Sequence, residues 1–253
     1  MVHLLDLTYL IRIMILFFRK DKNVMKWDKD YVREKYTNEV LGEKVIFYPS
    51  SKPKRLLVFF SSMHVDKYDR YSWFWDENES WDESSYLFIK DDSLQYYLGN
   101  PQKPERDKYA KIIKEYMGLC NVESNQVFAI GSSMGGYAAI YFAFYLSLNS
   151  AIVSNPQVDY SSAQAHAYRN WEKIIRQIGD DWYDLDKLVY RYNEVVNIYI
   201  EYGNYMADKL AAENLIHSLL KRRSHFIVKR TENATHDALL DKATILKAVN
   251  YFE

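Results

Sequence analysis

Residues 127–140 read VFAIGSSMGGYAAI, and this stretch decides which fold the sequence predicts. An apolar run ends at Ile130, a Gly-x-Ser-x-Gly turn follows, and small and apolar residues then continue with helical character. A strand, a sharp turn and a helix in this order form a nucleophile elbow, which holds its central serine in a strained conformation with the hydroxyl exposed. The chain has only 8 glycines, and three of them lie within residues 131–136, where strand and helix must approach closely.

Ser133 is the predicted nucleophile because it occupies the centre of this turn. Met134 is expected at the start of the following helix. Its amide is one expected donor to an oxyanion, since a helix N-terminus favours negative charge. The alternative interpretation is a glycine-rich turn that only packs a helix against a sheet. The five-residue pattern also occurs by chance, so its place between an apolar strand and a small-residue helix is what favours the nucleophile.

A serine with an ordinary pKa needs a general base, and the chain order with such an elbow is serine, acid and then histidine. Three histidines follow Ser133 at suitable distances. His217 lies in a predicted helix and His225 opens a predicted strand, so surface or packing roles suit them better. His236 lies in a loop between the last predicted strand and the last predicted helix, where the base is expected.

The acid of the site is expected just after the strand predicted at residues 194–202. Asp208 lies in the loop or first helical turn beyond this strand, and it is the favoured partner of His236. Glu201 is nearer the end of the strand and is the alternative, although its side chain could face away. The acid would orient the imidazole and stabilise its cation without itself taking the proton.

A second oxyanion donor is expected in the loop that follows the strand predicted at residues 55–60. The backbone amides of Ser62 and Met63 occupy the appropriate place in the chain. For His64 and Arg70, further along the same loop, substrate contact and a solvated loop are equal alternatives.

The rest of the chain alternates between short apolar runs and helical stretches. Apolar or β-branched runs predict strands at residues 44–48, 55–60, 86–90, 126–130, 151–154, 194–202 and 225–231. Helical periodicity predicts helices at residues 104–117, 137–148, 207–221 and 238–251. This alternation predicts an α/β fold whose mostly parallel sheet is covered on both faces. Residues 160–194 contain no clear strand and are interpreted as a small helical cap insertion.

Residues 4–18 read LLDLTYLIRIMILFF and have helical spacing of their apolar side chains. An apolar helix is therefore predicted within residues 1–20, ahead of one domain formed by residues 21–253. The apolar run is shorter than the ~20 residues that cross a bilayer, and it lacks the features of a secretory signal peptide. Packing on the protein or a partner is one interpretation, and peripheral contact with a membrane surface is the other.

The composition argues against several classes of function. Lys and Arg total 33 against 34 Asp and Glu, so there is no excess positive charge to attract nucleic acid. The single cysteine, Cys120, excludes an intrachain disulfide, and the scattered histidines predict no metal site. The sequence contains no glycine-rich phosphate loop, so a tightly bound nucleotide cofactor is not predicted. A reducing, cytoplasmic location is the default expectation, with the inner face of the membrane as the alternative.

Two motifs together resemble a known family. Residues 131–139 read GSSMGGYAA, and residues 154–157, after the next predicted strand, read SNPQ. Over residues 43–253 the chain resembles serine α/β-hydrolase-fold proteins of bacterial surface-polysaccharide gene sets, above all the capsular polysaccharide O-acetyltransferases. The resemblance implies an α/β-hydrolase-like sheet flanked by helices, and it places the family's nucleophile and base at Ser133 and His236.

The resemblance does not identify the acid, because residues 204–206 read NYM where the family has an acidic cluster. It implies that Ser133 attacks an acyl ester or thioester and forms an acyl-serine, with acetyl-CoA as a candidate co-substrate rather than a bound cofactor. A sugar hydroxyl as acceptor would give a polysaccharide O-acetyltransferase, and water would give an esterase. The alternative from another class is a catalytically silent hydrolase fold that serves polysaccharide assembly or secretion.

Overall fold

A computed structural model describes residues 27–253 of the chain. The apolar helix predicted within residues 1–20, and its membrane contact, lie outside the described residues. None of the helices within residues 27–253 is both long and apolar enough to cross a membrane.

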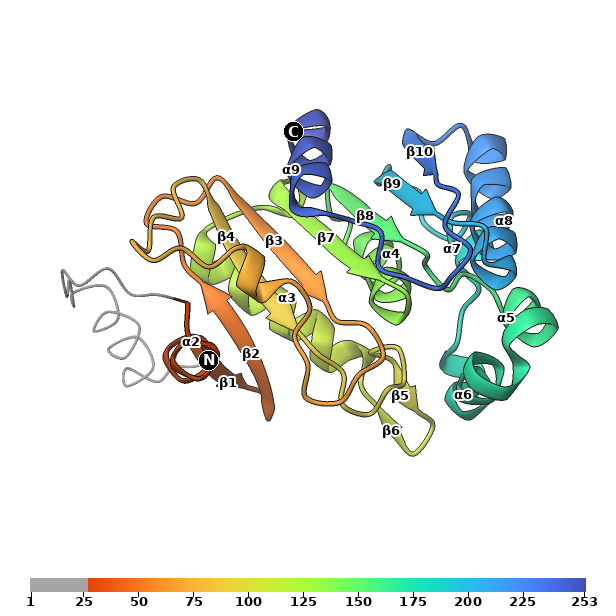
Figure 1. The fold of residues 1–253 in the computed structure, drawn as a ribbon, viewed down its shortest axis with the longest axis horizontal. Helices are drawn as coiled ribbons and strands as arrows, with labels where there is room; N and C mark the ends of the chain where they lie inside the picture. Colours follow the sequence, from red (N-terminus) through yellow and green to blue (C-terminus); the bar gives the residue numbers. More distant parts are fainter. Residues whose placement is uncertain (1–26) are drawn as a thin grey trace.

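The described residues form an eight-stranded sheet with the strand order β1-β2-β4-β3-β7-β8-β9-β10 (Figure 1). Strand β2 pairs antiparallel with β1 and β4, and all the other neighbouring strands of this sheet are parallel. A short hairpin, β5 with β6, lies outside the sheet. The strands are β1 (Thr37–Val40), β2 (Glu43–Tyr48), β3 (Arg55–Phe60), β4 (Ser84–Ile89), β5 (Gly99–Asn100), β6 (Lys103–Pro104), β7 (Val127–Ser132), β8 (Ser150–Ser154), β9 (Asn197–Tyr202) and β10 (Phe226–Arg230).

Helices cover both faces of the sheet, as the sequence predicts. Successive side chains of a strand point to opposite faces, so Val58 and Phe60 of β3 join one apolar cluster and Phe59 joins the other. The first cluster includes side chains of α3 (Arg106–Cys120), α4 (Met134–Tyr145) and α8 (Met206–Arg222). The second includes side chains of α2 (Lys29–Tyr36) and α9 (Lys242–Phe252).

The boundaries of some elements differ from the predictions for local reasons. Helix α9 begins at Lys242 rather than near residue 238, because the carboxylate of Asp241 accepts a hydrogen bond from the Thr244 amide and caps it. Helix α3 begins after Pro104, which pairs with Gly99 in the hairpin instead. Helix α2 and strand β1 were not predicted, because β1 is a short, largely polar edge strand without an apolar run.

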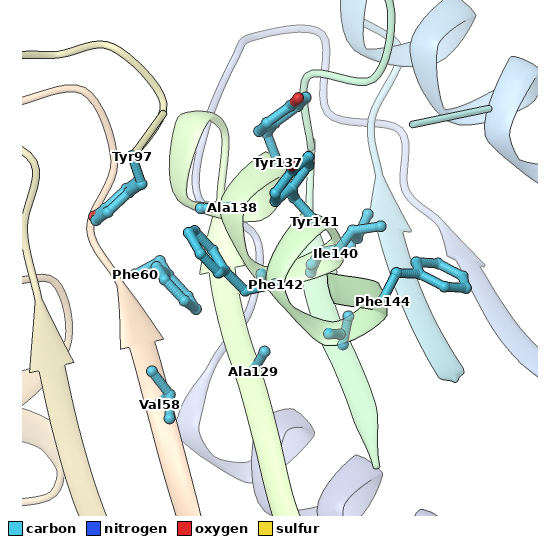
Figure 2. Packing of buried hydrophobic residues seen from close by; sticks show 14 of the residues in the cluster. Val58, Phe60, Tyr97, Ala129, Tyr137, Ala138, Ile140, Tyr141, Phe142 and Phe144 are labelled. Atoms are coloured by element: carbon cyan, nitrogen blue, oxygen red, sulfur yellow. The ribbon is translucent and has the colours of Figure 1, made fainter. Parts of the chain in front are cut away.

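Helix α4, which follows the elbow, is apolar on all sides and is buried along its length. Phe142 of α4 stacks on Phe60 of β3, with ring centroids 5.5 Å apart and an interplanar angle of 7° (Figure 2). Tyr97 meets the Phe60 ring edge-on at 5.2 Å. A helix that is hydrophobic all round belongs in a core, so the serine turn rests on rigid packing.

The cap, residues 160–194, is helical as predicted. It contains α5 (Tyr160–Ala167), a π-helical turn (Tyr168–Glu172), α6 (Lys173–Ile178), a 3₁₀ turn (Gly179–Asp181) and α7 (Leu185–Leu188). The carboxylate of Asp159 accepts hydrogen bonds from the amide and hydroxyl of Ser162, which fixes the start of α5. Contacts of α5 and α7 with α8 attach the cap to the body of the protein.

Two glycines allow three elements to approach one another at the elbow. A Cβ atom added at Gly131 would lie 2.1 Å from the carbonyl oxygen of Gly135. One added at Gly135 would lie 2.2 Å from the carbonyl oxygen of Phe60, at the end of β3. Both distances are far inside van der Waals contact, so β7, α4 and β3 can meet only because these side chains are absent.

Gly135→Ala should therefore destabilise the protein, lowering the free energy of unfolding by about 3 kcal/mol, because backbone rather than a flexible side chain opposes the new atom. Gly118→Ala is the matched control, since a Cβ at Gly118 of α3 meets nothing within 4 Å. The control should be neutral or stabilising by up to about 1 kcal/mol. Urea unfolding of both variants measures the difference, and equal stability of Gly135→Ala and the unchanged protein would contradict the close approach.

Candidate active site

The turn at residues 131–135 has the geometry of a nucleophile elbow. Strand β7 ends at Ser132 and α4 begins at Met134, so Ser133 occupies the single position between strand and helix. Its φ of 56° and ψ of −124° lie in a region that residues with side chains rarely adopt. The Ser133 amide donates to the Ser154 carbonyl at 3.1 Å, and the Ser133 carbonyl accepts from the Tyr137 amide at 3.0 Å. These bonds hold the strained residue in place from both sides.

Three of the side chains predicted from the sequence meet beside this turn. The Oγ of Ser133 lies 2.8 Å from the Nε2 of His236. The Nδ1 of His236 lies 2.8 Å from both carboxylate oxygens of Asp208. A histidine placed between a hydroxyl and a carboxylate can accept the hydroxyl proton while the carboxylate fixes the ring orientation.

The structure brings Asp208, and not Glu201, to the histidine. Asp208 is buried in the first turn of α8, and this burial raises the pKa of its carboxyl above the usual value while the hydrogen bond from His236 opposes the rise. Glu201 is also buried, but its carboxylate pairs with the Nζ of Lys229 at 2.8 Å. Lys229 faces Glu201 across the parallel pair β9 and β10, so this carboxylate belongs to the sheet and not to the histidine.

The backbone donors of the predicted oxyanion hole can be distinguished. The amide of Met134 stands at the N-terminus of α4, where a helix leaves its first amides without intrahelical partners. The amide of Ser62 donates to the Asp69 carboxylate at 2.8 Å, so this candidate is already committed. Met63 lines the cavity beside Ser133, and within residues 27–253 its amide has no hydrogen-bond acceptor. Of these two predicted amides, that of Met63 is therefore the one left without an acceptor beside the cavity.

Asn155, in the SNPQ segment that the sequence left without a role, ties the two loops of the site together. Its Nδ2 donates to the carbonyl of Asp237 at 2.8 Å, next to His236 in the chain. Its Oδ1 accepts from the amide of Gly203 at 3.0 Å, at the end of β9 and ahead of Asp208. A fully buried amide side chain thus sets the spacing between the histidine loop and the acid loop.

Gln157 contacts the serine hydroxyl directly. Its Nε2 donates to the Ser133 Oγ at 3.0 Å, and the side chain is buried. A hydroxyl that accepts this hydrogen bond keeps its own proton for the Nε2 of His236. In the sequence, Gln157 stood out only as part of the SNPQ segment and had no predicted role, although its position just beyond β8, the strand beside β7, was an available signal.

A cavity of about 1210 Å³ opens over Ser133 and His236. Its walls include residues between 62 and 73, from the loop after β3, and residues between 169 and 177, from the cap. Trp171 of the π-helical turn lies over the histidine, with the ring centroids 4.6 Å apart. The π-helical turn therefore forms part of the wall beside the imidazole, and turns of this kind occur frequently at functional sites.

The structure also places the two residues of the loop after β3 whose role was open. Both His64 and Arg70 line the same cavity, and Arg70 is buried there rather than part of a solvated loop. Within residues 27–253, no group of three or more His, Cys, Asp or Glu side chains is arranged to hold a metal ion.

Comparison with known proteins shows the fold. No family model and no curated protein sequence matches the chain. The capsule O-acetyltransferase of Neisseria meningitidis serogroup A is similar with a TM-score of 0.61 and 18% identity, over 85% of this chain and 92% of that chain. An S-formylglutathione hydrolase from Agrobacterium tumefaciens is similar with a TM-score of 0.64 and 14% identity, over 86% of this chain and 92% of that chain.

A third similar structure is larger than this protein. The Glycosylation Associate Protein (Gap123) complex from Streptococcus agalactiae matches with a TM-score of 0.57 and 17% identity. The match covers 85% of this chain but only 45% of that chain, so the protein spans less than half of that relative's length. Together these likenesses confirm the predicted fold class: an α/β-hydrolase-like, mostly parallel sheet flanked by helices.

Proposed function

We propose that the protein is a serine-dependent acyltransferase or esterase that works through an acyl-enzyme on Ser133. The observation that carries this proposal is the hydrogen-bonded series Ser133, His236 and Asp208, with both contacts of the imidazole at 2.8 Å. The strained conformation of Ser133 adds support, because such strain persists mainly where function uses it.

In the first half-reaction, the Ser133 Oγ attacks the carbonyl carbon of an ester or thioester while its proton moves to the Nε2 of His236. Asp208 stabilises the imidazolium that forms. The oxyanion of the tetrahedral intermediate accepts hydrogen bonds from the amides of Met134 and Met63. His236 then returns the proton to the departing alcohol or thiol, and the acyl group stays on the Ser133 oxygen.

In the second half-reaction, His236 takes a proton from the acceptor hydroxyl, whose oxygen attacks the acyl-serine. The bond between the acyl carbon and the Ser133 Oγ then breaks, and His236 returns the proton to that oxygen. The same geometry therefore serves hydrolysis and transfer, and the walls of the cavity decide which acceptor arrives. Trp171 lines the cavity and contacts the imidazole, and we infer that its indole stacks on a sugar ring. We infer that the acceptor is a hydroxyl of a bacterial surface polysaccharide.

Two similar structures support this chemistry. A variant of the meningococcal capsule O-acetyltransferase has been determined in complex with CoA, which supports acetyl-CoA as the donor. FphF of Staphylococcus aureus, described as a fluorophosphonate-binding serine hydrolase, has a TM-score of 0.60 to this chain. A silent role in polysaccharide assembly is the alternative, and the complete hydrogen-bonded series at Ser133 counts against it.

The deciding experiment incubates the purified protein with acetyl-CoA and candidate capsular polysaccharides. We expect O-acetyl groups to appear on the sugar, by NMR or mass spectrometry, faster than free acetate is released. Acetate release without sugar acetylation would make the protein an esterase. Absence of any turnover together with absence of fluorophosphonate labelling would contradict the acyl-enzyme and favour the silent role.

A further inference from the structure

The wall beside the nucleophile contains an arginine without a carboxylate partner. Arg70, in the loop after β3, is 7% exposed and lines the cavity together with Ser132 and Ser133. Its Nη2 donates to the Ser132 Oγ at 2.6 Å, while its buried Nε has no hydrogen-bond acceptor. Within the part of the chain that the structure describes, no Asp or Glu oxygen lies within 4.0 Å of this guanidinium.

The carboxylate next to Arg70 in sequence is engaged elsewhere. Asp69 accepts a hydrogen bond from the Ser62 amide at 2.8 Å, and its other oxygen lies 3.6 Å from the Nζ of Lys67. Burial lowers the pKa of the Arg70 guanidinium, with the charge of Asp69 opposing this shift. An arginine stays protonated even so, and a buried cation short of counter-charge is unfavourable until a ligand supplies it.

Backbone and side-chain contacts both fix the position of Arg70. Its φ of 64° and ψ of 0° are left-handed, a conformation that a long side chain seldom adopts. The Cζ lies 5.5 Å from the centroid of the Trp73 ring. Ser132, which accepts from Arg70, is itself hydrogen-bonded to the Ser154 Oγ at 2.6 Å. The guanidinium is thus held in advance of any ligand, as a binding group should be.

The remainder of the cavity has the same sign of charge. Six lysines and arginines line it against three aspartates, although the whole chain has a formal charge of −1. Among these cations, Arg33 is paired with Asp66 and Lys67 with Asp69. A cleft with an excess of one sign attracts ligands of the opposite sign, so the cavity favours an anion.

We propose that Arg70 binds a carboxylate or phosphate of the acyl acceptor, an acidic sugar, beside the hydroxyl that receives the acyl group from Ser133. This inference rests on the proposed function. Arg70, Ser133 and His236 line the same cavity, so an anion on Arg70 lies in the cavity that holds the reacting centre. An acidic sugar has its charge within one ring of its hydroxyls, whereas the pantetheine arm of CoA separates its phosphates from the thioester.

Binding should be measured on Ser133→Ala protein, which lacks the nucleophile and cannot turn over its ligands. Isothermal titration with glucuronate and glucose 6-phosphate, with glucose as the uncharged match, should show acidic sugars binding at least about tenfold more tightly. Adding Arg70→Met should weaken the binding of both acidic sugars at least about tenfold. Arg70→Lys should weaken it at least about threefold, because an ammonium lacks the paired donors of a guanidinium.

Lys67→Met is the matched control, because Lys67 also lines the cavity but is about half exposed and has a carboxylate partner. It should change the affinity for acidic sugars less than about threefold, as exposed charges usually do. Affinity for acidic sugars that is unchanged in Arg70→Lys would overturn the proposal, even if Arg70→Met does not fold.

A parallel titration with CoA separates the two sources of an anionic group. Loss of CoA affinity in the Arg70 variants, with acidic sugars unaffected, would assign the site to the donor and overturn its assignment to the acceptor. No step of this test requires catalysis. Failure of the anion site would appear in these titrations, whereas failure of the acyl chemistry would appear only in the turnover and labelling experiments.

Discussion

Ser133→Ala should abolish turnover of a short acyl ester, lowering kcat by a factor on the order of 10⁶, while the fold stays intact. The large effect follows because Ser133 Oγ is the atom placed 2.8 Å from the His236 Nε2, and no other hydroxyl is found bonded to that nitrogen within residues 27–253. Hydrolysis of 4-nitrophenyl acetate measures the rate, and circular dichroism checks the fold. A fluorophosphonate probe should no longer label the protein.

The neighbouring serine provides the control for this experiment. Ser132 Oγ is hydrogen-bonded to Arg70 and Ser154, and the structure does not place it at the histidine. Ser132→Ala should therefore still be labelled by the probe, at Ser133. Labelling that persists in Ser133→Ala and disappears in Ser132→Ala would transfer the nucleophile to the adjacent residue.

Backbone strain offers an independent check on the same residue. Ser133 has a positive φ, which glycine adopts without steric penalty. Ser133→Gly should therefore be as inactive as Ser133→Ala but more stable in urea unfolding. The relieved strain should raise the free energy of unfolding by roughly 1 kcal/mol, and the larger backbone entropy that glycine loses on folding reduces this gain. A substitution that relieves strain at an active-site residue can in this way abolish activity and increase the stability of the fold.

The elbow could be predicted because its signal is local. A strand, two glycines, a serine and a helix follow one another within fourteen residues, and each requirement is visible in residue type alone. His236 could be chosen from chain order, since the loop between the last strand and the last helix reaches the same edge of the sheet as the turn. The fold topology alone therefore predicts that the two segments lie close together, and side-chain packing need not be known.

The remaining groups of the site depend on contacts between distant segments. Arg70 reaches Ser132 across 62 residues, and Gln157 reaches Ser133 across 24. Trp171 contacts His236, 65 residues further along the chain, from the π-helical turn of the cap. No periodicity or motif in the sequence encodes such approaches.

The choice between Asp208 and Glu201 shows the same limit within a few residues. Glu201 lies at the end of the predicted strand and Asp208 a few residues beyond it, and either carboxylate could serve as the acid. Which one meets His236 depends on strand register, because the pairing of Glu201 with Lys229 on β10 settles where that carboxylate points. Register is a property of two strands together, so inspection of one strand could not decide it.

Asp208→Asn should lower kcat by a factor on the order of 10⁴, because an amide cannot stabilise the imidazolium and holds the ring in the wrong tautomer. Glu201→Gln is the comparison, since it removes the other buried carboxylate of this region without touching His236. It should retain activity to within about tenfold. Ester hydrolysis by the two variants measures the difference, and the reverse ranking would transfer the role to Glu201.

The stability of these two variants should change in the opposite order. Burial raises the pKa of Asp208 above its value in the unfolded chain, so the folded protein holds this proton more tightly. The protonated carboxyl therefore stabilises the folded protein in acid, and this stabilisation is lost as the pH rises from the unfolded pKa through the folded pKa. At neutral pH the buried carboxylate is ionised, which is unfavourable for folding. A neutral asparagine removes that penalty, so the Tm of Asp208→Asn at pH 7 should not fall below that of the unchanged protein. Glu201→Gln should lower Tm because Lys229 loses its partner, and a lower Tm for Asp208→Asn would show that its charge stabilises the fold.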